Sequence, residues 1–131
     1  MEIIENVYLA SYPEAKEFIP KLKNPFVINC TKDLPNVIPN NKCIHYRIPI
    51  NDHGEIEDTF YLKSVLDFVV KLIDDYPGPV VVHCKQGRQR SAAVVAGYLV
   101  HKRGLTFSEA VKFIQSIKRD AFFPQVNFDL S

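Results

Sequence analysis

The sequence predicts an α/β fold, a three-layer sandwich in which a central, mainly parallel sheet is flanked by helices. Short apolar runs of strand length alternate along the chain with longer segments whose apolar residues recur at helical spacing. The chain has 131 residues, and 47% of them are hydrophobic. This is enough to form one hydrophobic core but leaves no room for a second domain. We therefore expect a single domain over residues 1–131.

The first half of the chain carries the signals of one hairpin, one helix and two strands. An apolar pair and an apolar run of three residues, separated by a polar pair, predict a hairpin over residues 3–9, and residues 13–22 are expected to form a helix. The apolar run at residues 26–28 has no polar face, which is typical of a buried strand. Residues 44–50 alternate loosely and run into a loop, which indicates a strand that ends there.

The second half predicts three helices and one strand. Apolar residues recur at helical spacing over residues 59–75, and Asp58 is placed to cap the start of this helix. After a Pro-Gly-Pro break, the β-branched run at residues 80–82 predicts a buried strand. Residues 91–100 are apolar enough for a helix buried nearly all round, and a threonine–glutamate capping box at residues 106–109 starts the last helix.

The most informative segment is the loop that joins the strand at residues 80–82 to the helix at residues 91–100. A loop this short, ending at a helix N-terminus, turns backbone N–H groups inward and adds the positive end of the helix dipole, so an anion binds there readily. Its glycine supplies the backbone freedom that the turn needs. The residues expected to cradle a phosphate group are Lys85, Gln86, Gly87, Arg88, Gln89 and Arg90.

Cys84 and Arg90 are the two groups of this segment with distinctive chemistry. A thiol beside a helix N-terminus and cationic side chains loses its proton more easily than a free cysteine, so Cys84 is the candidate nucleophile. The planar guanidinium of Arg90 can hold two phosphoryl oxygens at once, which a lysine cannot. The spacing of the two residues is a weak signal alone, but the strand, the glycine and the helix around it make it specific.

The segment HCKQGRQRS, followed by AAVVAGYLV, resembles the signature loop and following helix of cysteine-dependent protein phosphatases, specifically the small dual-specificity branch. The segments ENVYLAS, PFVINCTKDLP, HYRIPINDHGEIED and SEAVKFIQSIKRDAFFPQVNF also resemble that branch, so the resemblance covers nearly the whole chain. It implies a protein tyrosine phosphatase-like fold. It also implies hydrolysis of phosphotyrosine, phosphoserine and phosphothreonine in proteins through a phosphocysteine intermediate, with no cofactor and no metal.

The resemblance also implies roles for four residues outside the phosphate cradle. The departing oxygen needs a proton, and Asp52 occupies the position of the family's general acid. Ser91 is expected to stabilise the sulfur as a leaving group, although its position also suits an ordinary helix cap. His83 is expected to order the loop rather than to transfer a proton. Cys30 lies where some relatives keep a cysteine that forms a protective disulfide with the oxidised nucleophile, so it is a possible redox partner.

The chain departs from the family pattern at two places. Gln89 stands where many members have a serine before the signature arginine. In the tail, Gln125 follows Pro124 where the family often has Pro-Asn. The resemblance therefore does not imply that a hydroxyl stiffens the loop. It also does not imply how the tail packs, and the oligomeric state is left open with it.

Two extra cations in the loop leave alternatives to a phosphoprotein substrate. With Lys85 and Arg88, the loop resembles the loops of lipid-phosphatase branches, which act on phosphoinositides or phosphatidylglycerophosphate. These substrates carry more negative charge than a single phosphate ester. A related class removes phosphate from RNA 5'-triphosphate ends, but its loop differs at residues 89–91. A phosphate-binding module without turnover is the alternative from a different class, although pure binding needs neither a thiol nor an acid.

Composition limits the partners and the compartment. A net charge of +1 argues against general affinity for nucleic acid or anionic membranes, which usually requires a large basic excess. Three cysteines without zinc-like spacing favour a reducing compartment, and no segment is typical of a targeting signal or a membrane span. We therefore expect a cytoplasmic protein whose partner is a phosphorylated protein, with no nucleic acid and no stable membrane association.

Overall fold

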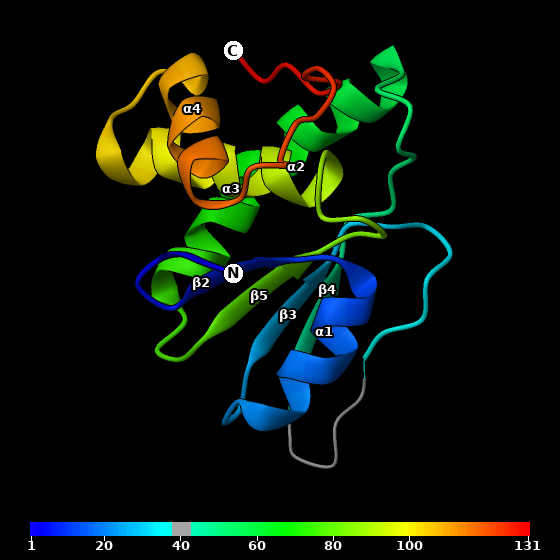
Figure 1. Ribbon diagram of the computed structural model, residues 1–131, viewed down its shortest axis with the longest axis vertical. Coiled ribbons are helices and arrows are strands. Elements are labelled where there is room, and N and C mark those ends of the chain that lie inside the picture. Colours follow the sequence, from blue (N-terminus) through cyan, green and yellow to red (C-terminus); the bar gives the residue numbers. More distant parts are fainter. Residues whose placement is uncertain (38–42) are drawn as a thin grey trace.

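A computed structural model of the protein describes residues 1–37 and 43–131, and in it five strands form one sheet (Figure 1). The strands are β1 (Glu2–Ile4), β2 (Val7–Ala10), β3 (Phe26–Asn29), β4 (Ile44–Arg47) and β5 (Val80–His83). Their order in the sheet is β1-β2-β5-β3-β4. Only the β1–β2 pair among these is antiparallel, so the mainly parallel sheet is confirmed.

Helices cover both faces of this sheet. They are α1 (Tyr12–Phe18), a short 3-10 helix η1 (Ile19–Lys21), α2 (Ile56–Asp75), α3 (Arg90–Arg103) and α4 (Phe107–Ile117). Figure 1 shows α1 on one face and α2, α3 and α4 on the other, which confirms the three-layer sandwich. Within residues 1–37 and 43–131, no helix has the length and apolar character that crossing a membrane requires.

The alternation of side chains along the central strands divides the core into two clusters. Val27 and Val81 pack with Ile19 in the smaller cluster beneath α1. Val82 and Leu99 belong to the larger cluster between the sheet and the other three helices. Strand β5 is buried along its whole length because both of its faces are covered, as expected for an inner parallel strand. A rigid central strand therefore leads directly into the loop that begins at Cys84.

The first helix is shorter than the sequence pattern predicts. We expected one helix over residues 13–22, but α1 ends at Phe18 and the chain continues as η1. Pro20 lies in η1, and a proline there has no N–H to donate and would clash with the carbonyl one turn earlier. The tighter 3-10 turn accommodates it.

The prediction that Asp58 caps α2 is wrong. The helix begins at Ile56, its N-cap is Glu55, and no side chain makes the cap hydrogen bond. Asp58 lies instead in the first helical turn, where a carboxylate is favourable next to the free N–H groups. The predicted capping box at the last helix is confirmed, because Glu109 N donates to Thr106 Oγ1 at 3.1 Å and Thr106 N donates to Glu109 Oε1 at 2.9 Å.

Candidate active site

The candidate site lies at the carboxyl edge of the sheet, in the loop between β5 and α3. The carboxyl ends of parallel strands meet at this edge, which is where open α/β sheets bind ligands. Cys84 comes directly after β5 and its residue is 1% exposed. Arg90 begins α3, so the loop between them is closed at both ends by regular structure.

The sulfur of Cys84 contacts two polar groups of this loop. Gly87 N donates a hydrogen bond to Cys84 Sγ at 3.2 Å. Ser91 Oγ lies 3.1 Å from the same sulfur, and either atom can be the donor. A backbone N–H, a hydroxyl and a helix N-terminus are groups that stabilise negative charge on sulfur.

Ser91 does not cap α3, which corrects the helix-cap interpretation of this residue. The N-cap position is occupied by Gln89, and no side chain makes a cap hydrogen bond there. The fully buried hydroxyl of Ser91 points instead at the sulfur of Cys84. The structure therefore brings Ser91 to the atom on which its predicted role depends.

Gly87 is required by both conformation and space. Its φ is +71°, in the left-handed region that side chains rarely adopt. A Cβ atom at this position would lie 2.8 Å from Ser11 N and 2.9 Å from the carbonyl carbon of Ala10. The loop thus packs tightly against the junction of β2 and α1.

Arg90 and Asp52 meet across the site. Arg90 is 6% exposed, and its Nη1 donates to the carbonyl oxygen of Ile50 at 3.1 Å. Arg90 Nε lies 3.4 Å from Asp52 Oδ1, which is an ion-pair distance, and the two atoms are not hydrogen-bonded. The loop after β4 is therefore attached to the phosphate loop through this guanidinium, which holds the expected clamp and the expected acid together.

The extra cations Lys85 and Arg88 differ in their surroundings. Lys85 is exposed, whereas Arg88 Nε lies 3.4 Å from Asp120 Oδ2. Asp120 also accepts a hydrogen bond from the buried Lys118 Nζ at 2.6 Å. Burial tends to raise the pKa of Asp120, but the hydrogen bonds and positive charges of Lys118 and then Arg88 hold it below its usual value. Arg88 and Lys118 thus share a single carboxylate, so the three side chains together keep a net positive charge.

His83 is fully buried beneath the loop, at the end of β5. Burial lowers the pKa of its imidazole to about 4, and the positive charges of Arg47 and Arg90 add to this effect, while the backbone of Cys84 opposes it. The ring is therefore neutral at pH 7. A neutral, buried ring in this place supports a role in packing the loop.

We expect the buried His83 to make the folded protein less stable in mild acid. Its pKa is about 4 in the folded state and about 6.5 in an unfolded chain. The unfolded state therefore binds more protons between these values, and stability is lost as the pH falls below the unfolded pKa. The free energy of unfolding should drop by about 2 kcal/mol between about pH 7.5 and about pH 5 through this residue.

Urea denaturation of the wild type and of His83→Gln at both pH values measures this effect. The pH dependence of the free energy of unfolding should be smaller in the variant by about 2 kcal/mol. Equal pH dependence in the two proteins would show that His83 is not held neutral by the fold.

Cys30 lies at the end of the strand next to β5. Its N–H donates to the carbonyl oxygen of His83 at 2.8 Å, which places it beside Cys84 in the parallel register. Burial raises the pKa of the Cys30 thiol well above its usual value, a negative charge on Cys84 raises it further, and Arg90 opposes both. Cys30, Cys43 and Cys84 are all free thiols, and the redox pairing of Cys30 stays a prediction.

Reasoning from the sequence missed two contacts of the site. The carbonyl group of Ile50 holds Arg90, and the buried carboxamide of Gln89 bonds to backbone groups of the C-terminal tail. A backbone carbonyl has no sequence signal, because every residue carries one. The sequence did carry a signal for the contact of Gln89 with the tail, because residue 89 departs from the serine that many family members have.

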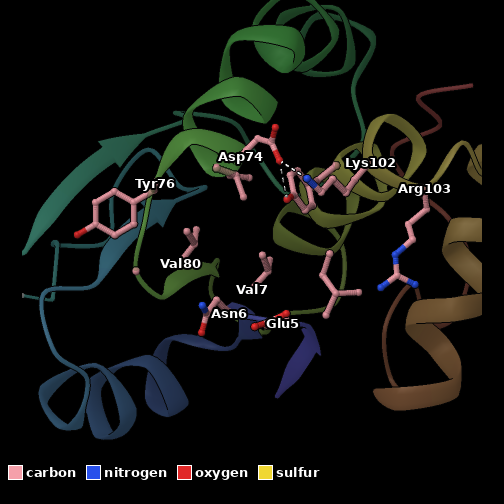
Figure 2. A pocket seen from close by; sticks show the side chains of 12 residues that line it. Glu5, Asn6, Val7, Asp74, Tyr76, Val80, Lys102 and Arg103 are labelled. Carbon is pink, nitrogen blue, oxygen red and sulfur yellow. Dashed lines mark hydrogen bonds and ion pairs between the residues drawn. The ribbon is translucent and has the colours of Figure 1, made fainter.

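A separate cavity of about 270 Å³ lies at the opposite end of the sheet (Figure 2). Val7 and Val80 lie at its floor, and the ion pair of Asp74 with Lys102 lies at its rim. Val80 begins β5 and Cys84 follows its end, so about 13 Å of strand separates this cavity from the phosphate loop. The cavity is therefore not part of the candidate site. Among residues 1–37 and 43–131, no group of three His, Cys, Asp or Glu residues is placed to hold a metal ion.

Comparisons with known proteins agree with this geometry. The family model for the dual specificity phosphatase catalytic domain matches residues 7–130. Human Dual specificity protein phosphatase 9 is 30% identical over 131 residues, which is 98% of this chain and 34% of that protein. Dual specificity protein phosphatase 1B of Arabidopsis thaliana is 28% identical over 123 residues, covering 92% of this chain and 72% of the relative. The chain thus spans about a third of the length of the first of these relatives.

Solved structures show the same fold. A variant of human DUSP28 superposes with a TM-score of 0.81 at 25% identity, covering 97% of this chain and 86% of that one. A human tyrosine phosphatase-like serine/threonine/tyrosine-interacting protein has a TM-score of 0.76 at 22% identity, covering 97% and 88%, a likeness that shows the fold alone. Because the family model matches nearly the whole length of this chain, the chain belongs to the dual specificity phosphatase catalytic-domain family.

Proposed function

We propose that the protein hydrolyses phosphate esters of tyrosine, serine and threonine side chains in proteins, with Cys84 as the nucleophile. One observation carries the proposal: a sulfur, a hydroxyl, a guanidinium and a carboxylate converge on one loop. Cys84 Sγ is 3.1 Å from Ser91 Oγ, and Arg90 Nε is 3.4 Å from Asp52 Oδ1. Simple phosphate binding would use the guanidinium and the backbone N–H groups alone.

The proposed reaction has two steps. In the first, the Cys84 thiolate attacks phosphorus, an S–P bond forms, and the bond from phosphorus to the substrate oxygen breaks while Asp52 gives that oxygen a proton. In the second, Asp52 takes a proton from water, the resulting hydroxide attacks phosphorus, and the S–P bond breaks. Ser91 donates to the thiolate that leaves, and inorganic phosphate is released.

The surroundings of Arg88 favour phosphoprotein over polyanionic substrates. Its guanidinium is engaged with Asp120 at 3.4 Å, so this ion pair would have to break before Arg88 could turn to a second phosphate group on a lipid or an RNA end. Lys85 is exposed, and a solvated charge of this kind contributes little binding energy to one phosphate. A polyanionic substrate would instead require both Lys85 and Arg88 to bind it.

A substrate panel tests the proposed function. Catalytic efficiency should be at least about tenfold higher on phosphotyrosine and phosphothreonine peptides than on phosphoinositides, phosphatidylglycerophosphate or triphosphorylated RNA. The reverse order would assign the protein to a polyanionic substrate. Phosphopeptide binding without phosphate release from any of these would assign it to the binding modules.

Removing the two extra cations should change peptide hydrolysis only modestly. In a Lys85→Ala, Arg88→Ala protein we expect kcat/KM on a phosphotyrosine peptide to fall by less than about fivefold, because one charge is solvated and the other is already paired. A charge-matched control, Lys71→Ala with Arg103→Ala, alters exposed cations on α2 and α3. A larger loss on phosphoinositide than on peptide, absent from the control, would make the cations specificity elements for polyanions.

We also propose a reducing compartment, in which the three free thiols persist. Cys30 is proposed as the partner that could capture an oxidised Cys84 as a disulfide. Peroxide treatment followed by peptide mapping tests this: a Cys30–Cys84 disulfide is expected, and irreversible oxidation of Cys84 with Cys30 untouched would exclude it.

A further inference from the structure

The buried side chain of Gln89 links the phosphate loop to the C-terminal tail. Gln89 is 4% exposed, and its Nε2 donates to the carbonyl oxygens of Phe123 at 3.3 Å and Gln125 at 2.7 Å. Its Oε1 accepts from Asn127 N at 3.0 Å. The partners are two backbone acceptors and one backbone donor, so only this orientation of the carboxamide satisfies all three.

The tail segment held in this way is otherwise exposed. Residues 123–126 are exposed, whereas Phe122 and Phe128 on either side of the segment are buried in the core. Phe122 N also donates to the carbonyl oxygen of Arg88 at 2.6 Å, one residue before Gln89. Two buried rings therefore anchor the ends of the segment, and the Gln89 carboxamide holds the part between them.

The other side of the same segment touches the loop that carries Asp52. Gly54 has a φ of +69°, and a Cβ atom there would collide with the carbonyl oxygen of Asn127 and lie 3.1 Å from its carbonyl carbon. The backbone of Asn127 is thus packed between Gly54 on the acid loop and Gln89 on the phosphate loop. The two residues that depart from the family pattern, Gln89 and Gln125, are joined by a separate hydrogen bond from the Gln89 carboxamide to the backbone carbonyl of Gln125.

We propose that Gln89 is a positioning residue that places the general acid by holding the tail against the acid loop. The inference rests on the proposed function, since it concerns the step in which Asp52 gives a proton to the leaving oxygen. Phosphate binding does not depend on it, because the contacts of Cys84, Gly87 and Arg90 within the site do not involve the tail. Loss of Gln89 should therefore affect proton donation and leave affinity nearly intact.

A double-mutant cycle tests the proposal. Gln89→Ala should lower kcat on a phosphothreonine peptide by about tenfold with KM changed less than about twofold, and the loss should shrink on an aryl phosphate whose leaving group needs no proton. In an Asp52→Asn background, Gln89→Ala should cost less than about a further twofold, because the group that it positions is already gone. Equal losses on all substrates, or losses that multiply in the double variant, would overturn the proposal.

Two further variants separate positioning from general damage to the fold. Gly54→Ala disturbs the same contact from the acid loop and should reproduce the selective loss of kcat. Gln125→Ala removes an exposed side chain but keeps the carbonyl that Gln89 binds, so it should retain wild-type kcat. A Gln125→Ala loss as large as that of Gln89→Ala would show that the tail is sensitive for another reason.

Amide hydrogen exchange tests the coupling without turnover. In Gln89→Ala, exchange should rise in residues 122–128 and also in residues 51–55, while β5 stays protected. Faster exchange in the tail alone would show that Gln89 does not reach the acid loop. If the wild type proved inactive on every phosphate ester, the proposed function would fail, whereas this measurement would still decide whether Gln89 couples the two loops.

Discussion

A Cys84→Ser protein is expected to lose at least about 10⁴-fold in kcat on an aryl phosphate while still binding a phosphotyrosine peptide. A serine hydroxyl stays protonated at neutral pH and is a much weaker nucleophile. The cradle remains, because the packing of Gly87 against Ala10 and Ser11 and the hydrogen bond from Arg90 to Ile50 do not involve the sulfur. Measuring phosphate release and peptide binding on the same preparation tests both the loss of turnover and the retained affinity.

Cys43→Ser is the matched control for this prediction. Cys43 is a half-buried thiol that lies 3.5 Å from His45 Nε2, outside the phosphate loop, and its replacement should leave kcat at the wild-type value. Retention of turnover by Cys84→Ser would exclude a covalent mechanism at this residue.

Replacing Asp52 with asparagine should lower kcat on a phosphothreonine peptide by about 10²- to 10³-fold. An alkoxide is a poor leaving group and requires the proton that Asp52 supplies. A nitrophenolate leaves without one, so the loss on p-nitrophenyl phosphate should be much smaller. Steady-state kinetics on the two substrates give this ratio directly.

Glu57 provides the comparison, because it is an exposed carboxylate in the first turn of α2, close in sequence to the acid loop. Glu57→Gln should leave the ratio between the two substrates unchanged. If Glu57→Gln lost more activity on phosphothreonine than Asp52→Asn, the general acid would be Glu57 and the ion pair of Asp52 with Arg90 would be structural only.

Signals confined to a few neighbouring residues predicted the fold well. Three successive valines and a following glycine predicted a buried strand and a tight turn, and both are present at β5 and Gly87. The capping box at Thr106 predicted the start of α4 to the residue. Such features depend on local backbone preferences, which the sequence states directly.

Contacts between distant segments could not be predicted in the same way. Asp58 looked like a helix cap, but α2 begins at Ile56 without a side-chain cap, because packing of a long amphipathic helix outweighs one missing hydrogen bond. The carbonyl of Ile50 and the backbone of Asn127 are partners of Arg90 and Gln89 that any residue type could supply. The departure at Gln89 was visible in the sequence, whereas its partners in the tail required the structure.

The central claim is that a phosphoryl group passes through the sulfur of Cys84. Ser91→Ala removes the hydroxyl 3.1 Å from that sulfur, so the second step should slow and the intermediate should accumulate. Rapid acid quench during the first turnover, followed by mass spectrometry of the Cys84 peptide, is the direct measurement. The account predicts a phosphoryl group on Cys84, at higher occupancy in Ser91→Ala than in the wild type. Phosphate release at the wild-type rate with Cys84 unmodified at every quench time would contradict it.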